Sequence, residues 1–181
     1  MQIDALITAY VNSFSGRFAL LDGFMIFFAK AAIFLLVLSV AVRWFPHSKR
    51  ELQRYLAISC GFAVALGLLL NQGILLLVDR VRPYDLGVTH LIVERSADPS
   101  FPSDHATVAF AIALMLLLKR DRLANLYLLF ALLVALARIY IGTHFLTDVL
   151  GGVATALIGS LLVHKLYNSE SMLNQRLIRI L

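Results

Sequence analysis

The chain has 181 residues, of which 60% are hydrophobic and only 15% are charged. Soluble domains of this length carry about a quarter charged residues, so the composition excludes an ordinary soluble protein and predicts an integral membrane protein. The formal net charge is +5, but the basic residues gather in short segments between apolar runs. This distribution is typical of membrane topology and argues against a nucleic-acid partner.

The first 23 residues, MQIDALITAYVNSFSGRFALLDG, contain only a brief apolar run. They lack the basic start and the small-residue cleavage site of a signal peptide. We interpret residues 1–23 as a helix that lies in the membrane interface, in preference to a short sixth span.

Five longer apolar runs follow, and a spanning helix needs about 20 mostly apolar residues. None of the runs shows the alternating pattern of a barrel strand, so helices are the expected spanning elements. We therefore predict an all-α membrane protein, a helical bundle of five to six transmembrane helices. It forms one domain over residues 1–181, with the bundle at 24–166 and a tail at 167–181. The predicted spans are Phe24–Arg43, Leu52–Val78, His105–Leu118, Leu123–Ile141 and Phe145–Leu166.

The positions of the basic residues predict the orientation of the bundle. Ten of the 16 lysines and arginines lie between runs one and two, between runs three and four, or after run five. An excess of lysine and arginine marks cytoplasmic loops, so we expect these ends inside and residues 79–104 and 142–144 outside. The ten are Arg43, Lys49, Arg50, Arg54, Lys119, Arg120, Arg122, Lys165, Arg176 and Arg179.

The segment that joins the last two runs, ARIYIGTHFLTDVLGG, holds an arginine, a histidine and an aspartate. His144 and Asp148 are four residues apart, so at the start of a helix they share one face. An aspartate that accepts a hydrogen bond from one imidazole nitrogen leaves a lone pair on the other nitrogen. This is the arrangement of an activated nucleophile or base. Arg138 precedes the turn, and its guanidinium suits a tetrahedral oxyanion.

The third run opens with FPSDH, on the same predicted outer side. Ser103 fits the N-cap position, and a helix start offers free N–H groups and a positive dipole end that favour bound phosphate. His105, in the first turn, can donate a proton to a leaving oxygen. Arg82, at the end of run two, adds a second guanidinium on this side.

Each of these residues also has an ordinary explanation by itself. A histidine or an aspartate at a helix end commonly caps the helix, and an arginine at the membrane edge commonly snorkels to water. Two histidines and one acid could also bind zinc. Two arginines beside the site favour an anion over a cation, so we predict a phosphate site that uses no metal and no cofactor.

The three clusters together resemble the motifs of the type 2 phosphatidic-acid-phosphatase (PAP2) superfamily of integral membrane phosphatases. That family shows a lysine six residues before Arg-Pro, then Pro-Ser-Gly-His, then Ser-Arg, five residues, His, three residues and Asp. The matching segments here are Arg82-Pro83, Pro102–His105 and Ala137–Asp148. The resemblance covers about residues 24–166.

This resemblance implies a covalent mechanism. In the family scheme His144 attacks phosphorus and forms a phosphohistidine, Asp148 orients it, and His105 protonates the leaving group. The groups that hold the phosphoryl oxygens are Arg82, Ser103, Arg138 and the backbone at Asp104. Phosphoryl transfer depends mainly on positioning and charge stabilisation, which these residue types supply.

Three positions depart from the family pattern. Leu75 stands where the family has its lysine, Asp104 replaces the usual glycine, and Ala137 replaces the usual serine. A leucine cannot hold a phosphate. The carboxylate of Asp104 should repel a phosphate unless it is turned away or paired with a cation.

Other residues near the site are candidates for the missing role. On a continuing helix Leu75, Asp79 and Arg82 share one face, so we expect Asp79 to support Arg82. Arg80 can replace the lysine only if the helix end unwinds. Lys30, which interrupts run one, either snorkels outward or approaches the site in place of the lysine.

The absence of the lysine, together with FPSDH and THFLTDVLGG, resembles the undecaprenyl-diphosphate phosphatase branch of the bacitracin-resistance type. The branch implies an enzyme of the bacterial inner membrane that removes the terminal phosphate of an isoprenoid lipid diphosphate on the outer face. Alternative substrates are lipid A 1-phosphate, phosphatidylglycerophosphate and phosphatidic acid. A non-enzymatic scaffold or transporter with a relic site, and vanadate haloperoxidase chemistry, are more distant alternatives. The sequence leaves the oligomeric state open.

Overall fold

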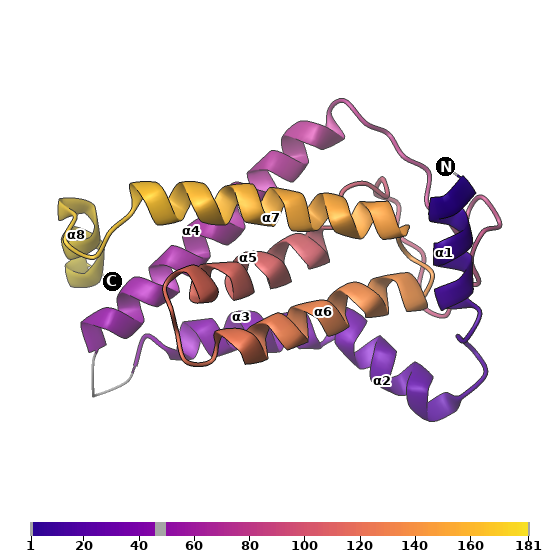
Figure 1. Ribbon diagram of the computed structural model, residues 1–181, viewed down its shortest axis with the longest axis horizontal. Helices are drawn as coiled ribbons and strands as arrows, with labels where there is room; N and C mark the ends of the chain where they lie inside the picture. Colours follow the sequence, from indigo (N-terminus) through magenta and orange to yellow (C-terminus); the bar gives the residue numbers. More distant parts are fainter. Residues whose placement is uncertain (1, 46–49, 181) are drawn as a thin grey trace.

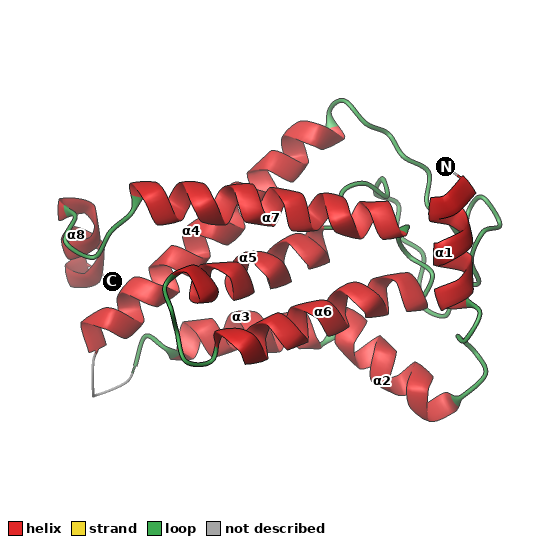
Figure 2. Cartoon of the chain, in the orientation of Figure 1, coloured by secondary structure: helices red, strands yellow, loops and turns green. Residues whose placement is uncertain are grey.

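The structure is a computed structural model that describes residues 2–45 and 50–180, and within them all regular structure is helical (Figure 1, Figure 2). The prediction of an all-α protein is therefore confirmed. Lys49, one of the predicted cytoplasmic cations, lies outside the described residues. The helices are α1 (Gln2–Asn12), α2 (Ala19–Lys30), α3 (Ala32–Val42), α4 (Arg50–Leu75), α5 (Asp104–Leu118), α6 (Ala124–Tyr140), α7 (Leu146–Leu166) and α8 (Met172–Ile180).

Helix α5 forms the centre of the bundle and contacts α4, α6 and α7. Its apolar residues are buried on several sides, among them Ala109, Ile112 and Met115. Burial all round a helix is expected where other helices enclose it. The apolar character of α5 therefore serves helix packing more than contact with lipid.

Helix α7 approaches its neighbours closely at two glycines. A Cβ at Gly152 would lie 2.5 Å from the carbonyl oxygen of Ser103, and one at Gly159 would lie 3.0 Å from the carbonyl oxygen of Ala63. Small residues allow such close helix packing in membrane proteins. The contact at Gly152 brings the start of α7 against the start of α5, where the predicted site residues lie.

The first predicted span, Phe24–Arg43, is not one straight helix. The chain bends by 47° between α2 and α3, at Ala31. The guanidinium Nη1 of Arg138 donates to the carbonyl of Ala29 at 3.3 Å, and a side chain that enters the hydrogen-bond ladder is a known cause of a kink. Helix α2 also begins at Ala19, so residues 19–23 belong to it and not to a separate N-terminal segment.

Helix α4 ends at Leu75, three residues before the predicted boundary at Val78. Leu76 and Leu77 follow in a turn and are each 86% exposed within the protein, so they find no packing partner that would prolong the helix. The expectation that Leu75, Asp79 and Arg82 share one helix face is therefore wrong.

The apolar helices differ in length. Glu51–Leu75 and Leu146–Leu166 are long and apolar enough to cross a membrane, and the bent pair α2 and α3 counts as a third candidate if it forms one span. The predicted spans His105–Leu118 and Leu123–Ile141 correspond to α5 and α6, which are shorter apolar helices of 15 and 17 residues.

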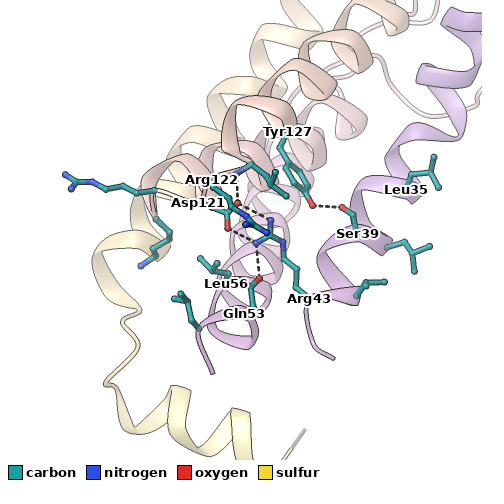
Figure 3. A pocket seen from close by; sticks show the side chains of 14 residues that line it. Leu35, Ser39, Arg43, Gln53, Leu56, Asp121, Arg122 and Tyr127 are labelled. Atoms are coloured by element: carbon teal, nitrogen blue, oxygen red, sulfur yellow. Dashed lines mark hydrogen bonds and ion pairs between the residues drawn. The ribbon is translucent and has the colours of Figure 1, made fainter. Parts of the chain in front are cut away.

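A cavity of about 970 Å³ opens at the end of the bundle that holds the α5–α6 loop (Figure 3). Arg43 and Asp121 form a bidentate ion pair in it, with Nη1–Oδ2 and Nη2–Oδ1 distances of 2.7 and 3.1 Å. Apolar side chains such as Leu35 and Leu56 line its walls. None of the residues of the predicted phosphate site lines this cavity. We interpret it as a space between the helix ends on the side of the bundle where the basic residues gather.

We expect Arg43→Met to lower the free energy of unfolding by about 3 kcal/mol, because it leaves the carboxylate of Asp121 without its partner. The two side chains are only 10% and 7% exposed, so solvent screens the pair little. Unfolding in mixed micelles measures the change. Arg95→Met is the control, since Arg95 and Asp85 form an exposed pair whose loss should cost less than about 1 kcal/mol. Equal effects of the two substitutions would contradict a structural role for the buried pair.

Candidate active site

The three predicted clusters meet at the end of the bundle opposite the cavity, where the loop 76–103, the start of α5 and the α6–α7 turn converge (Figure 1). Arg82 Nη1 donates to the carbonyl of Thr143 at 2.9 Å. The backbone N–H of Ser103 donates to the carbonyl of Asp148 at 3.0 Å. The side chains that the sequence placed together therefore do lie together.

The α6–α7 turn has a fixed shape. Gly142 has a φ of +86°, and a Cβ there would lie 2.6 Å from the carbonyl oxygen of His90, so this position requires glycine. The hydroxyl of Thr143 donates to the carbonyl of Arg138 at 2.9 Å and closes the end of α6. As a result His144 is held two residues before α7 begins.

The imidazole of His144 is buried, and its surroundings define its tautomer. Nδ1 lies 2.8 Å from the carbonyl oxygen of Ser100, an acceptor that requires a hydrogen on this nitrogen. Nε2 lies 3.5 Å from Nη1 of Arg82 and 3.3 Å from Nη2 of Arg138. In this tautomer Nε2 carries a lone pair that faces two guanidinium groups.

Asp148 is fully buried and sits beside His144, but it does not make the direct hydrogen bond that the spacing suggested. Its Oδ2 is 3.6 Å from Nδ1 of the histidine. The carboxylate instead accepts from the N–H of Phe145 at 2.7 Å, from the hydroxyl of Ser100 and from Nη1 of Arg80 at 2.6 Å. The Ser100 carbonyl takes the orienting role that the sequence assigned to the aspartate, and Asp148 supplies a nearby negative charge.

Two buried arginines face the Nε2 edge of the imidazole. Arg82 is fixed by donation from Nε to the carbonyl of Asp98 at 2.8 Å, in addition to its bond to the α6–α7 turn. Arg138, in the last turn of α6, is fixed by the carbonyl of Ala29. Both side chains keep N–H groups directed at His144, and such a pair suits a tetrahedral oxyanion.

Two buried donors at the site have no hydrogen-bond partner within the described chain, namely the hydroxyl of Ser103 and Nε of Arg138. Ser103 occupies the N-cap position of α5, as predicted, but its side chain makes no capping bond. Buried polar groups in proteins are normally hydrogen-bonded. With the free N–H groups of the first turn of α5, these donors are available to a bound anion.

His105 lies in the first turn of α5 and is half-buried. It is close enough to Arg82, Arg138 and His144 to interact with their charges. Within residues 2–45 and 50–180 no group of three histidine, cysteine or acidic side chains is arranged to hold a metal ion. Arg82, Arg138 and Ser103 offer donors for an anion beside the two histidines.

The carboxylate of Asp104 is held by a residue that the sequence did not single out. Asn71, which is buried in α4, donates from Nδ2 to Oδ1 of Asp104 at 2.7 Å and to the hydroxyl of Thr107 at 2.8 Å. A neutral amide, and not a cation, therefore fixes the one acidic side chain of the FPSDH segment.

We expect Asn71→Leu to raise KM about fivefold to tenfold, because the released carboxylate of Asp104 can turn toward the substrate phosphate and repel it. Steady-state phosphate release measures the change. Gln72→Leu, at an exposed neighbouring position of α4, is the control. Adding Asp104→Asn to Asn71→Leu should recover most of the lost affinity. If the double variant is as impaired as Asn71→Leu, charge repulsion is not the cause.

The three candidates for a supporting role at the site, Arg80, Asp79 and Lys30, lie in different surroundings. Arg80 reaches the site because α4 has ended, but its guanidinium bonds to the carboxylates of Asp148 and Asp4. Asp79 is exposed and provides none of the hydrogen bonds of Arg82, so its predicted supporting role is wrong. Lys30 forms an exposed ion pair with Glu94 at 2.6 Å, which supports snorkelling over replacement of the family lysine.

Comparison with known proteins agrees with the motifs. The sequence matches the PAP2 superfamily over residues 56–171. The chain belongs to the PAP2 superfamily. It is 30% identical over 148 residues to undecaprenyl-diphosphatase BcrC of Bacillus subtilis (strain 168), a match that covers 82% of this chain and 76% of that protein. The predicted family is confirmed, and with it a membrane phosphatase.

Two crystal structures are similar to most of the chain. One is the transmembrane PAP2 type phosphatidylglycerolphosphate phosphatase of Bacillus subtilis, with a TM-score of 0.66, 24% identity and coverage of 94% of this chain and 87% of that one. The other is LpxE of Aquifex aeolicus, with a TM-score of 0.64, 24% identity and coverage of 88% and 93%. At this identity the two similarities establish the fold.

In this PAP2 enzyme the environment of His144 favours the neutral imidazole. Burial, which is the largest cause, and the charges of Arg138 and Arg82 lower the pKa of His144 to about 4, against the opposing effect of Asp148. The imidazole is therefore unprotonated at neutral pH. A histidine must be in this form to attack an electrophile.

Two contributors to the PAP2 site were missed from the sequence. Ser100 stands three residues before Ser103 in the same polar segment, so its position gave a usable signal. Asn71 lies within an apolar run, and an amide at that depth is a recognised marker of a buried polar contact. Its partner in α5 is 33 residues away in the chain, beyond the reach of local spacing.

Proposed function

We propose that this protein hydrolyses the terminal phosphate of an isoprenoid lipid diphosphate, with undecaprenyl diphosphate as substrate and undecaprenyl phosphate and phosphate as products. The observation that carries the proposal is the arrangement of His144. Its Nδ1 is fixed by a carbonyl, and its Nε2 faces two buried arginines at 3.5 and 3.3 Å. The name of the Bacillus subtilis relative, an undecaprenyl-diphosphatase, supports the choice of lipid.

The first step transfers the phosphoryl group to the enzyme. Nε2 of His144 attacks the terminal phosphorus, and the bond between this phosphorus and the bridging oxygen breaks. His105 donates a proton to the departing oxygen, so the lipid leaves as a monophosphate. The guanidinium groups of Arg82 and Arg138, the hydroxyl of Ser103 and the N–H of Asp104 stabilise the charge on the phosphoryl oxygens.

The second step releases phosphate. His105, now neutral, accepts a proton from water as the water oxygen attacks phosphorus, and the bond between phosphorus and Nε2 breaks. His144 returns to its neutral form and His105 to its protonated form. Asp148 stabilises the positive charge that the imidazole of His144 acquires while it carries the phosphoryl group. The scheme requires neither a metal nor a cofactor.

We further propose that the helices form five membrane spans, with α2 and α3 as one bent span, and that the enzyme resides in the bacterial inner membrane with its site on the outer face. The gathering of cations such as Arg43 and Lys119 at the opposite end supports this orientation, because basic loops remain in the cytoplasm. A lipid diphosphate could then enter from the bilayer, with its tail between helices and its head group at the arginines.

Phosphate release by the purified protein tests the proposed substrate. Undecaprenyl diphosphate, phosphatidylglycerophosphate, phosphatidic acid and lipid A 1-phosphate are compared in the same micelles, with His144→Ala as the background. We expect the highest kcat/KM for undecaprenyl diphosphate. A strong preference for lipid A or for a glycerophospholipid would replace the proposed substrate, and the absence of phosphate release from all four lipids would overturn the enzymatic function.

A further inference from the structure

The start of α7 is only partly capped by its own sequence. The N-cap residue, Phe145, has no side-chain acceptor, and among the backbone N–H groups at the start of α7 Asp148 accepts only that of Phe145. The next two N–H groups, at the first two helical positions, need acceptors from elsewhere because the helix itself offers none. This matters for the site because α7 carries Asp148 and begins two residues after His144.

The missing acceptors come from α1. The hydroxyl of Thr8 accepts from the N–H of Leu146 at 3.1 Å. Oδ1 of Asp4 accepts from the N–H of Thr147 at 3.1 Å. The other oxygen of Asp4 accepts from Arg80 at 2.7 Å, and Arg80 in turn donates to the catalytic-site carboxylate. Helix α1 therefore caps α7 from outside.

A third residue of α1 holds the other side of the turn. Asn12 donates from Nδ2 to the carbonyl of Tyr140 at 2.8 Å, in the last turn of α6, and exchanges hydrogen bonds with the backbone of His90. Asp4, Thr8 and Asn12 are spaced four residues apart and so form one face of α1. This face contacts both ends of the turn that presents His144.

In α1 the polar side faces the protein and the apolar side is exposed, the reverse of a helix on the surface of a soluble protein. Thr8 and Asn12 are buried, whereas Ile3, Leu6 and Tyr10 on the opposite side are 74%, 69% and 69% exposed. Hydrogen bonds from the polar face therefore attach α1 to the bundle, together with the packing of Val11 against the core. Figure 1 shows α1 across the end of the bundle, at a steep angle to α6 and α7. In that position the apolar side is suited to the lipid–water interface.

We propose that α1 is a positioning element of the active site, with Asp4, Thr8 and Asn12 as positioning residues that hold the start of α7 and thereby the relative placement of His144 and Asp148. This inference rests on the proposed function, because it concerns the geometry of that reaction. Small displacements of a reacting group lower rates strongly, so the loss of one cap should lower kcat about tenfold and leave substrate affinity nearly unchanged.

A matched set of hydroxyl variants tests the role of Thr8. Thr8→Val keeps the shape of the side chain and removes the acceptor, Thr8→Ser keeps the acceptor, and Ser13→Ala removes an exposed hydroxyl that bonds only within its own segment. For each purified variant we would measure kcat, KM and the midpoint of thermal unfolding. We expect kcat to fall about tenfold in Thr8→Val alone, with KM within about twofold of the original, and Thr8→Ser to retain the rate.

Each other outcome has a defined meaning. A wild-type kcat in Thr8→Val overturns the proposal. Equal losses of kcat in Thr8→Val and Thr8→Ser overturn it in favour of simple packing. If Thr8→Val does not fold, Asp4→Asn is judged by the same kcat and KM criteria. The unsubstituted protein and His144→Ala are assayed alongside, so that a failure of the proposed phosphatase activity is distinguished from a failure of the role of α1.

Discussion

Replacing His144 with alanine is expected to lower kcat for phosphate release by about 10⁵-fold, because the substitution removes the atom that forms the bond to phosphorus. The remaining arginines, Ser103 and the start of α5 should still bind phosphate, so KM should change little. Phosphate release from a lipid diphosphate in micelles measures the effect. The unsubstituted protein, quenched during turnover, should carry acid-labile phosphate, and the variant should carry none.

The fold should tolerate this substitution. His144 makes one hydrogen bond through Nδ1, to the carbonyl of Ser100, and the turn around it is fixed independently by Gly142 and Thr143. A thermal midpoint close to that of the unsubstituted protein would show that the loss of activity is chemical. Turnover at the wild-type rate in His144→Ala would refute the covalent mechanism and leave the family membership untouched.

Local spacing predicted the parts of the site that are close together in the chain. Arg138, His144 and Asp148 lie on a helix end, a short turn and a helix start, so their separation in sequence limits their separation in space. The direct bond between the histidine and the aspartate was the exception. Nδ1 of His144 and Oδ2 of Asp148 are 3.6 Å apart, because the first turn of α7 directs the carboxylate toward the N–H of Phe145 and toward Ser100.

Helix boundaries were predicted less well where the apolar run extends beyond the end of the helix. The run that forms α4 stays apolar through Val78, but helical structure stops at Leu75 where packing partners stop. Next to the break between α2 and α3, the carbonyl of Ala29 accepts from Arg138, a residue more than 100 positions away. A pattern within one run contains no information on such a contact.

The N-terminal segment contains a polar pattern that hydrophobicity alone does not reveal. An interfacial helix was predicted from the short apolar run, and the polar residues at positions 4, 8 and 12 of the same stretch define a second face. In a membrane protein the polar face of a short helix can be the buried one, since lipid receives the apolar face. The four-residue spacing of those residues therefore indicates the face of α1 that contacts α6 and α7, which the apolar run does not.

Replacing Arg138 with methionine is expected to lower kcat/KM by about 10³-fold, the loss typical of a donor that stabilises developing charge. The same variant should change the pH dependence. Arg138 lowers the pKa of His144, so without its charge the pKa rises from about 4. The attacking imidazole must be neutral, hence the acid limb of kcat/KM should move to higher pH. The pH profiles of variant and unsubstituted protein, taken with one substrate, measure this shift.

Two further substitutions separate charge from geometry. Arg138→Lys keeps the positive charge but loses the planar fork of donors, so the rate should fall while the acid limb stays in place. Asp148→Asn removes the one charge that raises the pKa of His144. The acid limb of kcat/KM in this variant should therefore move to lower pH, in the direction opposite to the shift in Arg138→Met. Shifts in the same direction for Arg138→Met and Asp148→Asn would contradict the assignment of the limb to His144. Opposite shifts would link the observed rate to a neutral histidine held between two arginines and one carboxylate, an arrangement that the fold builds from the segment Arg138–Asp148 and the distant Arg82.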